Sequence, residues 1–284
     1  MSLEITAFFH GPSSTYSYVL AEGGHAAVID PALDYDAASG RSGTASVQKL
    51  VEHVKSRGLV LDWILETHAH ADHLSAAQFA KRELGGKVAI GAGIQAVQAT
   101  FKKLYNLGAD FPADGSQFDK LFEDGENVRL GGATLRVMAM PGHTSDSVAY
   151  IVEDAAFVGD TLFMPDSGSA RCDFPGGDAG ALYDSIRRLL DLPEETRLFM
   201  CHDYAPGGRE HRNQTTVGEA RRGNIHVKDG VSREDFVKLR RDRDATLPVP
   251  ALLLPAIQVN IRAGRFPEPE KDGNSYLKIP LDKL

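Results

Sequence analysis

Cysteine is scarce in this chain, with only Cys172 and Cys201 among 284 residues and no CxxC pair. A disulfide framework is therefore excluded, and such low cysteine content is typical of proteins in a reducing compartment. We interpret the two cysteines as buried, inert thiols rather than as redox groups.

Long apolar runs are also absent. No segment of about 18 uncharged apolar residues occurs, and the richest candidate, residues 247–259, is interrupted by prolines. The amino-terminal sequence MSLEITAFFHGPSS lacks the basic stretch and apolar run of a signal peptide. These features favour a cytoplasmic protein with no membrane partner.

Basic residues are fewer than acidic ones: the chain has 31 Lys and Arg and 39 Asp and Glu, which gives a formal net charge of −8. An acidic surface repels phosphate backbones, so we expect no nucleic-acid partner. One short stretch is locally basic, and we interpret it as a solvated face, with attraction of an anionic substrate as the alternative. Its arginines are Arg209, Arg212, Arg221 and Arg222.

Strand and helix patterns alternate along the chain. Clusters of β-branched and aromatic residues predict strands at 5–10, 16–22, 26–30, 61–68, 87–91 and 197–202. Strand pairs with tight turns are predicted at 128–143 and 147–160, and amphipathic helices at 44–58, 75–84, 93–108 and 178–193. This mixture, without a break in composition, favours one α/β domain with a carboxyl-terminal extension.

A dense group of potential metal ligands follows the apolar strand LDWILE. It consists of His68, His70, Asp72 and His73. Neutral imidazole and carboxylate are the usual ligands of zinc and iron, whereas a solvated turn gains nothing from such a density of histidines. We therefore interpret the segment as a metal-binding loop rather than a chance surface turn.

Three further candidates lie at strand ends: His143, Asp160 and His202. A single histidine beside a strand is more often a core or capping residue. Several such junctions in one chain indicate a shared site, because helices between the strands would bring these strand ends to one rim.

The motif HxHxDH at 68–73, followed in order by His143, Asp160 and His202, resembles the metallo-β-lactamase superfamily. The resemblance covers roughly residues 3–225. It implies an α/β (α+β) fold, an αββα sandwich of two facing mixed β-sheets with outer helices and a metal site along one edge. We accordingly expect a catalytic domain over 1–225 and an extension over 226–284 packed on the same domain.

The fold does not fix the reaction, because it hosts hydrolases, nucleases and oxygenases. The chain has no room for the inserted domain of the nucleases, and it has His70 where flavodiiron relatives have Glu. The segment Arg171-Cys-Asp-Phe and the run His202-Asp203-Tyr204 resemble the persulfide dioxygenase family, as does PAIQVNIRAG near the carboxyl end. The alternative is a dinuclear thioester hydrolase similar to glyoxalase II, which the chain resembles only in the metal motif.

The dioxygenase resemblance implies one Fe(II) per chain, held by His68, His143 and Asp160. Residue types alone do not identify the metal, since such a ligand set also binds zinc. Asp72, His73 and His202 would form a catalytic polar network around the metal, or these three residues together with His70 would be a vacated second metal site. His70 and Asp30 are expected to orient the ligands through hydrogen bonds.

The implied reaction converts glutathione persulfide, O2 and water to sulfite and glutathione. We expect Arg171 to grip a substrate carboxylate, with a structural ion pair to Asp173 as the alternative. Tyr204 is expected to donate its hydroxyl to the substrate or to oxygen, or else to be a core residue. The apolar, proline-rich tail favours a homo-oligomer, most simply a dimer.

Overall fold

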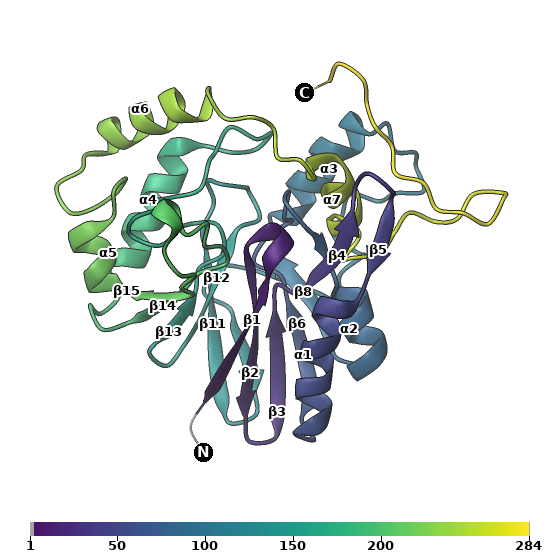
Figure 1. Ribbon diagram of the computed structural model, residues 1–284, viewed down its shortest axis with the longest axis horizontal. Coiled ribbons are helices and arrows are strands. Elements are labelled where there is room, and N and C mark those ends of the chain that lie inside the picture. The colour runs from purple at the N-terminus through teal and green to yellow at the C-terminus, as the bar shows by residue number, and fades with distance from the viewer. Residues whose placement is uncertain (1–2, 284) are drawn as a thin grey trace.

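The computed structural model describes residues 3–283, and two six-stranded sheets form its centre (Figure 1). The first sheet has the order β1-β2-β3-β6-β8-β9 and is antiparallel at β1–β3 and parallel from β3 to β9. Its strands are β1 (Glu4–His10), β2 (Thr15–Glu22), β3 (His25–Ile29), β6 (Val60–Leu65), β8 (Lys87–Gly91) and β9 (Lys120–Phe122).

The second sheet has the order β10-β11-β12-β13-β14-β15, and only its β13–β14 pair is parallel. Its strands are β10 (Asn127–Leu130), β11 (Ala133–Ala139), β12 (Val148–Val152), β13 (Ala155–Phe157), β14 (Arg197–Phe199) and β15 (Gln214–Thr216). A small third sheet, which the sequence patterns did not predict, contains β4 (Ala32–Asp36), β5 (Arg41–Gly43) and β7 (Leu74–Ser75).

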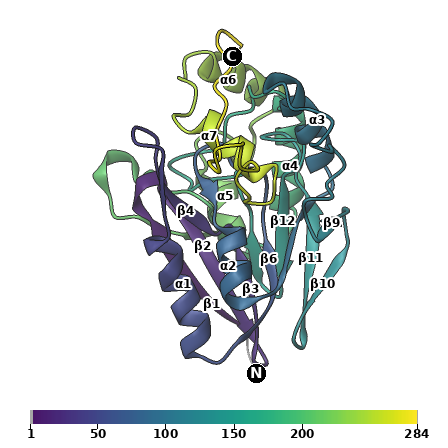
Figure 2. The same ribbon diagram turned by 90° about the vertical axis from the view of Figure 1, so that its right-hand side faces the viewer.

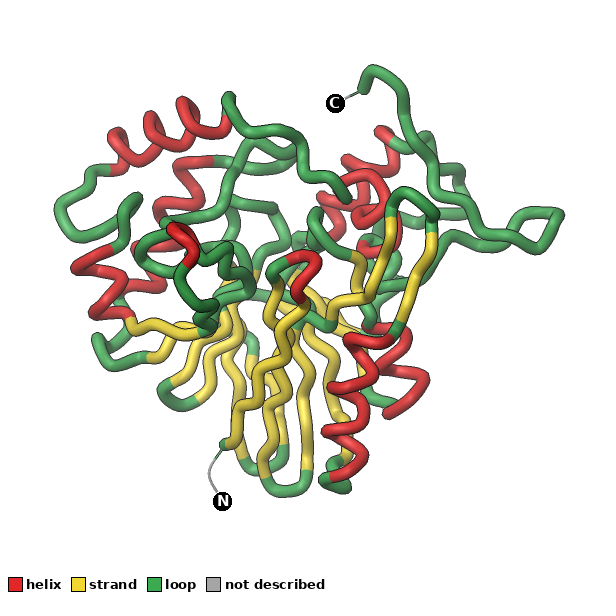
Figure 3. The backbone as a smooth tube through the Cα atoms, in the orientation of Figure 1, coloured by secondary structure: helices red, strands yellow, loops and turns green. Residues whose placement is uncertain are grey.

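Helices cover the outer faces of the two sheets (Figures 2 and 3). They are α1 (Ala45–Ser56), α2 (Ala77–Leu84), α3 (Ile94–Leu104), α4 (Ala179–Leu190), α5 (Val217–Gly223), α6 (Arg233–Asp244) and α7 (Leu253–Asn260). Apolar residues of α1–α3 and α7 pack with the first sheet, and those of α4–α6 pack with the second.

The centre of the sandwich is a buried layer between the sheets. Tyr18 and Leu20 of the first sheet pack there with Tyr150, Phe157 and Phe199 of the second. Burial of aromatic and aliphatic side chains from both inner faces holds the sheets together. The predicted sandwich of two mixed sheets with outer helices is confirmed.

The carboxyl-terminal segment contributes to the outer layers on both sides. Phe236 of α6 lies in the cluster under α4, and Leu253 and Ile257 of α7 lie in the cluster under α1–α3. Pro255 falls in the first turn of α7, where its missing N–H breaks no helical hydrogen bond. The boundary between residues 225 and 226 stays a prediction.

Three smaller expectations can be compared with the structure. Both cysteines are buried and free. The arginines of the basic stretch are each within ion-pair distance of a carboxylate, such as Arg209 with Asp166 and Asp203, so they form an ion-paired face. Across residues 3–283, no helix combines the length and apolar character needed to traverse a membrane.

Candidate metal centre

The candidate ligands lie at one edge of the sandwich, each a few residues after the end of one of four strands. The chain leaves β6 before His68, β11 before His143, β13 before Asp160 and β14 before His202. A glycine precedes two of these residues in a conformation that side chains disfavour: Gly142 has φ +143° and Gly159 has φ +52°. A Cβ at Gly142 would collide with the Leu182 backbone, so the turn that places His143 requires glycine.

His68, His143 and Asp160 form one compact group of buried ligand atoms. Asp160 Oδ2 lies 3.9 Å from His68 Nε2 and 3.7 Å from His143 Nε2. The structure thus brings together the three residues that the resemblance implies as iron ligands. Two imidazoles and one carboxylate on one side leave the opposite side open for other ligands.

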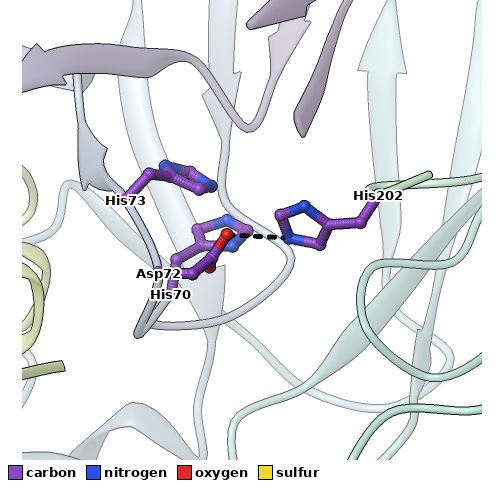
Figure 4. A group of neighbouring side chains, drawn as sticks. All are labelled: His70, Asp72, His73 and His202. Atoms are coloured by element: carbon purple, nitrogen blue, oxygen red, sulfur yellow. Dashed lines mark ion pairs between the residues drawn. The ribbon is translucent and has the colours of Figure 1, made fainter. Parts of the chain in front are cut away.

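A second group lies beside the first and contains His70, Asp72, His73 and His202 (Figure 4). His202 Nε2 connects the two groups, at 3.3 Å from Asp72 Oδ2 and 3.4 Å from Asp160 Oδ1. Our sequence interpretation left His70 either as an orienting residue or as part of a vacated second metal site, and the structure places one of its ring nitrogens among the potential ligands.

The hydrogen bonds of His68 and His143 fix the inward-facing nitrogen as a lone-pair donor. The Thr67 hydroxyl donates to Asp30 Oδ2 (2.8 Å), so it must accept from His68 Nδ1 (3.0 Å). His143 Nδ1 donates to the backbone carbonyl of Arg171 (2.6 Å). In the neutral ring each Nε2 then carries a lone pair, and it faces the carboxyl group of Asp160.

Several of these inward-facing atoms are buried without a hydrogen-bond partner: His68 Nε2, His70 Nδ1, Asp72 Oδ2, His73 Nε2, Asp160 Oδ1 and His202 Nε2. Burial and the neighbouring imidazoles keep the pKa of His68 well below its usual value, and burial and His70 lower that of His73 to about 3. The neutral imidazoles of His68 and His73 and the neighbouring carboxylate oxygens converge without hydrogen-bond partners, which fits a bound cation because unpaired buried polar groups are costly.

Asp30 holds the metal-binding loop (residues 68–73, called the metal loop below) in place through hydrogen bonds to Thr67 and His70. It follows β3 with φ +48°, an uncommon conformation for a residue other than glycine. Its carboxylate accepts from the Thr67 amide (2.7 Å), the Thr67 hydroxyl and His70 Nε2 (3.1 Å). Burial alone would raise the pKa of Asp30, but His70 and these hydrogen bonds outweigh it and lower the pKa.

A cavity opens beside the ligands and contains the predicted substrate residues. The Tyr204 ring stacks on His202 at 5.7 Å between centroids, and no hydrogen bond within residues 3–283 engages its hydroxyl. Arg171 also lines the cavity, but its guanidinium donates to both Asp173 oxygens (2.7 Å each) and to the Pro248 carbonyl (2.6 Å). The alternative ion pair is therefore present, and substrate contact by Arg171 stays a prediction.

Asn260 is a site residue that the sequence interpretation missed. This buried side chain at the end of α7 donates from Nδ2 to the carbonyls of His70 (2.7 Å) and His73 (2.8 Å). Its Oδ1 accepts from the Ser75 amide (2.8 Å). The available signal was an amide side chain within the largely apolar segment PAIQVNIRAG, which also contains Gln258.

Comparison with known proteins identifies relatives of this chain. The family model described as metallo-beta-lactamase superfamily matches residues 10–202. A Burkholderia pseudomallei protein named "Probable metallo-hydrolase" is 51% identical over 99% of this chain and 100% of its own length. "Glyoxylase B2" of Dictyostelium discoideum is 51% identical over 91% of this chain and 89% of its length.

Two further similarities bear on the reaction. Human "Persulfide dioxygenase ETHE1, mitochondrial" is 30% identical over 90% of this chain and 87% of its own length. The crystal structure of ETHE1 from Myxococcus xanthus aligns with a TM-score of 0.73 at 30% identity, covering 92% of this chain and all of that one.

Proposed function

This chain belongs to the metallo-β-lactamase superfamily, and we propose that within it the protein is a persulfide dioxygenase. The proposed substrate is glutathione persulfide, which O2 and water convert to sulfite and glutathione. One Fe(II) per chain would be held by His68, His143 and Asp160. The proposed location is the cytoplasm.

The observation that carries the proposal is the group of two histidines and one carboxylate with unpaired inward-facing atoms. This ligand set, with open positions opposite, is typical of non-haem iron oxygenases. The similarity to the human protein named persulfide dioxygenase and to the Myxococcus ETHE1 structure supports the same choice.

When bound, the iron would supply the oxygen chemistry and the positive charge that attracts a persulfide anion. The protein's own residues prepare the site for it. The carbonyl of Arg171 and the hydroxyl of Thr67 hold the two histidines with Nε2 facing inward. Phe163, Phe174 and Tyr204 line the adjoining cavity, so apolar surface limits water there, while the Tyr204 hydroxyl is available to donate to the substrate.

A glyoxalase II-like thioester hydrolase is the second candidate, because one observation favours it. The group of His70, Asp72, His73 and His202 has the composition of a second metal site, adjacent to the first through Asp160. A relative named "Glyoxylase B2" supports this alternative. Two metals would then share the site, and water rather than O2 would be the second substrate.

Metal content and two assays on one preparation test the choice. Protein produced in iron-sufficient medium is expected to contain about one iron per chain. It should consume O2 and release sulfite only when glutathione persulfide is present. His143→Ala should lose both iron and activity, whereas His25→Ala, in the half-exposed pair with Asp62, should lose neither. Two zinc ions per chain, with hydrolysis of S-lactoylglutathione and no O2 consumption, would overturn the proposal.

A further inference from the structure

The cavity beside the metal ligands extends from these ligands to helix α6 and the segment after it. Its lining includes Asp72, His143 and Asp160 of the metal centre and also Arg240, Arg243 and Leu247, and we call this second part of the lining the α6 end. Phe163, Phe174 and Tyr204 contribute aromatic surface to the same cavity. A molecule occupying it would therefore meet the metal ligands with one part and arginines with another.

Two of the three arginines in the cavity are matched by carboxylates. Arg171 forms its bidentate pair with Asp173. Arg240, which is 1% exposed, is paired with the buried Asp244 and also donates to the Ser169 carbonyl. These two pairs are internally neutral, so neither guanidinium needs a ligand to balance its charge.

Arg243 differs from both. It is exposed on the cavity rim, and within residues 3–283 its guanidinium forms no ion pair or hydrogen bond. Beside it, Arg240 Nε is buried without a hydrogen-bond partner. The α6 end of the cavity thus has one unmatched positive charge and one unused buried N–H donor.

The positive potential at the α6 end of the cavity affects the pKa of the neighbouring His226. Burial, and then the guanidinium groups of Arg240 and Arg243, lower the pKa of His226 to about 4. The carboxylate of Asp244 opposes the shift without cancelling it. An anion placed here would gain from this field.

We propose that the α6 end of the cavity binds a carboxylate of the substrate, with Arg243 as the contacting residue. The carboxylate is then one of those carried by the glutathione persulfide proposed above. This inference rests on the proposed function for the identity of the reacting group, but the carboxylate site itself is independent of the reaction. Guanidinium and carboxylate are complementary in charge and in hydrogen-bonding geometry.

Arg241 provides a matched control for Arg243. It is on the same helix, is exposed and lies outside the cavity lining. Arg241→Gln and Arg243→Gln remove the same charge from the same helix. A difference between them therefore reports contact rather than the general field of the protein.

Steady-state kinetics provide the first test. With glutathione persulfide, Arg243→Gln should raise KM by roughly 10–100-fold, the scale of one charged hydrogen bond, and change kcat far less. Arg241→Gln should leave both constants near those of the parent protein. With the persulfide of the glutathione diester, which lacks free carboxylates, Arg243→Gln and the parent should have similar KM values. Equal KM values for parent and Arg243→Gln with glutathione persulfide would overturn the proposal.

A binding measurement separates this inference from the proposed reaction. Calorimetric titration with S-methylglutathione, which cannot react, should show weaker binding to Arg243→Gln than to Arg241→Gln or the parent. If no persulfide supports O2 consumption but this difference remains, the reaction is wrong and the carboxylate site stands. If O2 consumption is normal and the three proteins bind S-methylglutathione equally, the carboxylate site is wrong.

Discussion

Asn260 and His73 are 187 positions apart, yet Asn260 Nδ2 donates to the His73 carbonyl at 2.8 Å. The same amide group donates to the His70 carbonyl at 2.7 Å. The end of α7 therefore fixes the backbone of the metal loop at two of its histidines. Helix α7 is thereby part of the support of the metal centre, although it contributes no ligand.

Substitution of Asn260 should loosen the metal loop. Asn260→Ala leaves the His70 and His73 carbonyls without this donor, and we expect roughly 10–100-fold weaker metal retention, the usual scale for residues that orient ligands. The rate of metal transfer to a chelator measures this. Asn274→Ala, in the exposed tail, is the control. Equal transfer rates would show that α7 does not support the site.

Asp72→Asn distinguishes a mononuclear from a dinuclear centre. Asp72 Oδ2 lies 3.3 Å from His202 Nε2 and has no hydrogen-bond partner. Asn keeps the size of the side chain but removes the charge that a second metal requires. We expect iron to remain near one equivalent, with turnover lowered by about 10–100-fold. Loss of one of two bound metals together with all activity would instead favour the hydrolase.

The Arg171–Asp173 pair should support the loop that orients His143. The Arg171 carbonyl accepts from His143 Nδ1, while its side chain is held by Asp173. Arg171→Lys and Asp173→Asn both break the bidentate pair, so we expect both to weaken iron retention by similar factors. A higher KM for glutathione persulfide in Arg171→Lys, with Asp173→Asn unaffected, would identify Arg171 as a substrate contact.

His226 should make stability sensitive to mild acid. Its Nδ1 accepts from the Ser169 amide (3.0 Å), which requires the neutral ring. Burial and then Arg240 and Arg243 lower its folded-state pKa to about 4, from the ordinary histidine value of 6.5. The unfolded chain therefore binds a proton first as the pH falls, and the stability contribution, complete above 6.5, is lost towards pH 4.

His226→Asn keeps a side-chain acceptor but does not titrate in this range. Urea unfolding at several pH values should show a smaller loss of stability between pH 6.5 and 4 than in the parent. His25→Asn, at a half-exposed position, is the control. The same pH dependence in parent and His226→Asn would contradict the prediction.

The carboxyl-terminal tail should mediate self-association. Ile279 and Leu281 are 70% and 78% exposed, and Val249, Phe266 and Tyr276 are further exposed apolar residues of the same terminal region. We expect a homodimer, and Ile279→Ser with Leu281→Ser should weaken it because less apolar surface is buried. Light scattering measures the mass, with Val60→Ser as the control for an exposed apolar residue elsewhere. A monomeric parent protein would refute the prediction.

The main strands and helices could be predicted because their patterns are local. The amphipathic pattern at 44–58 places Val47, Leu50, Val51 and Val54 on one face, and these are the residues that α1 buries. The small third sheet was missed because β5 is a short strand in a local hairpin with β4, and because the two-residue strand β7 pairs with β4 across a long stretch of sequence. Helix α7 was missed because prolines mask an otherwise apolar helix.

The sequence by itself determined which residue types are available for a metal, because their order and their positions after strands are properties of the chain. It did not determine which ring nitrogen faces inward, since this depends on Asp30, which accepts from the Thr67 hydroxyl, and on the Arg171 carbonyl, and only folding brings these two groups to the site. Likewise, the Arg171 side chain is paired with Asp173, whereas Arg243 on the cavity rim is not paired within residues 3–283. Charge balance and hydrogen-bond partners are relations in space, so only the tertiary structure decided them.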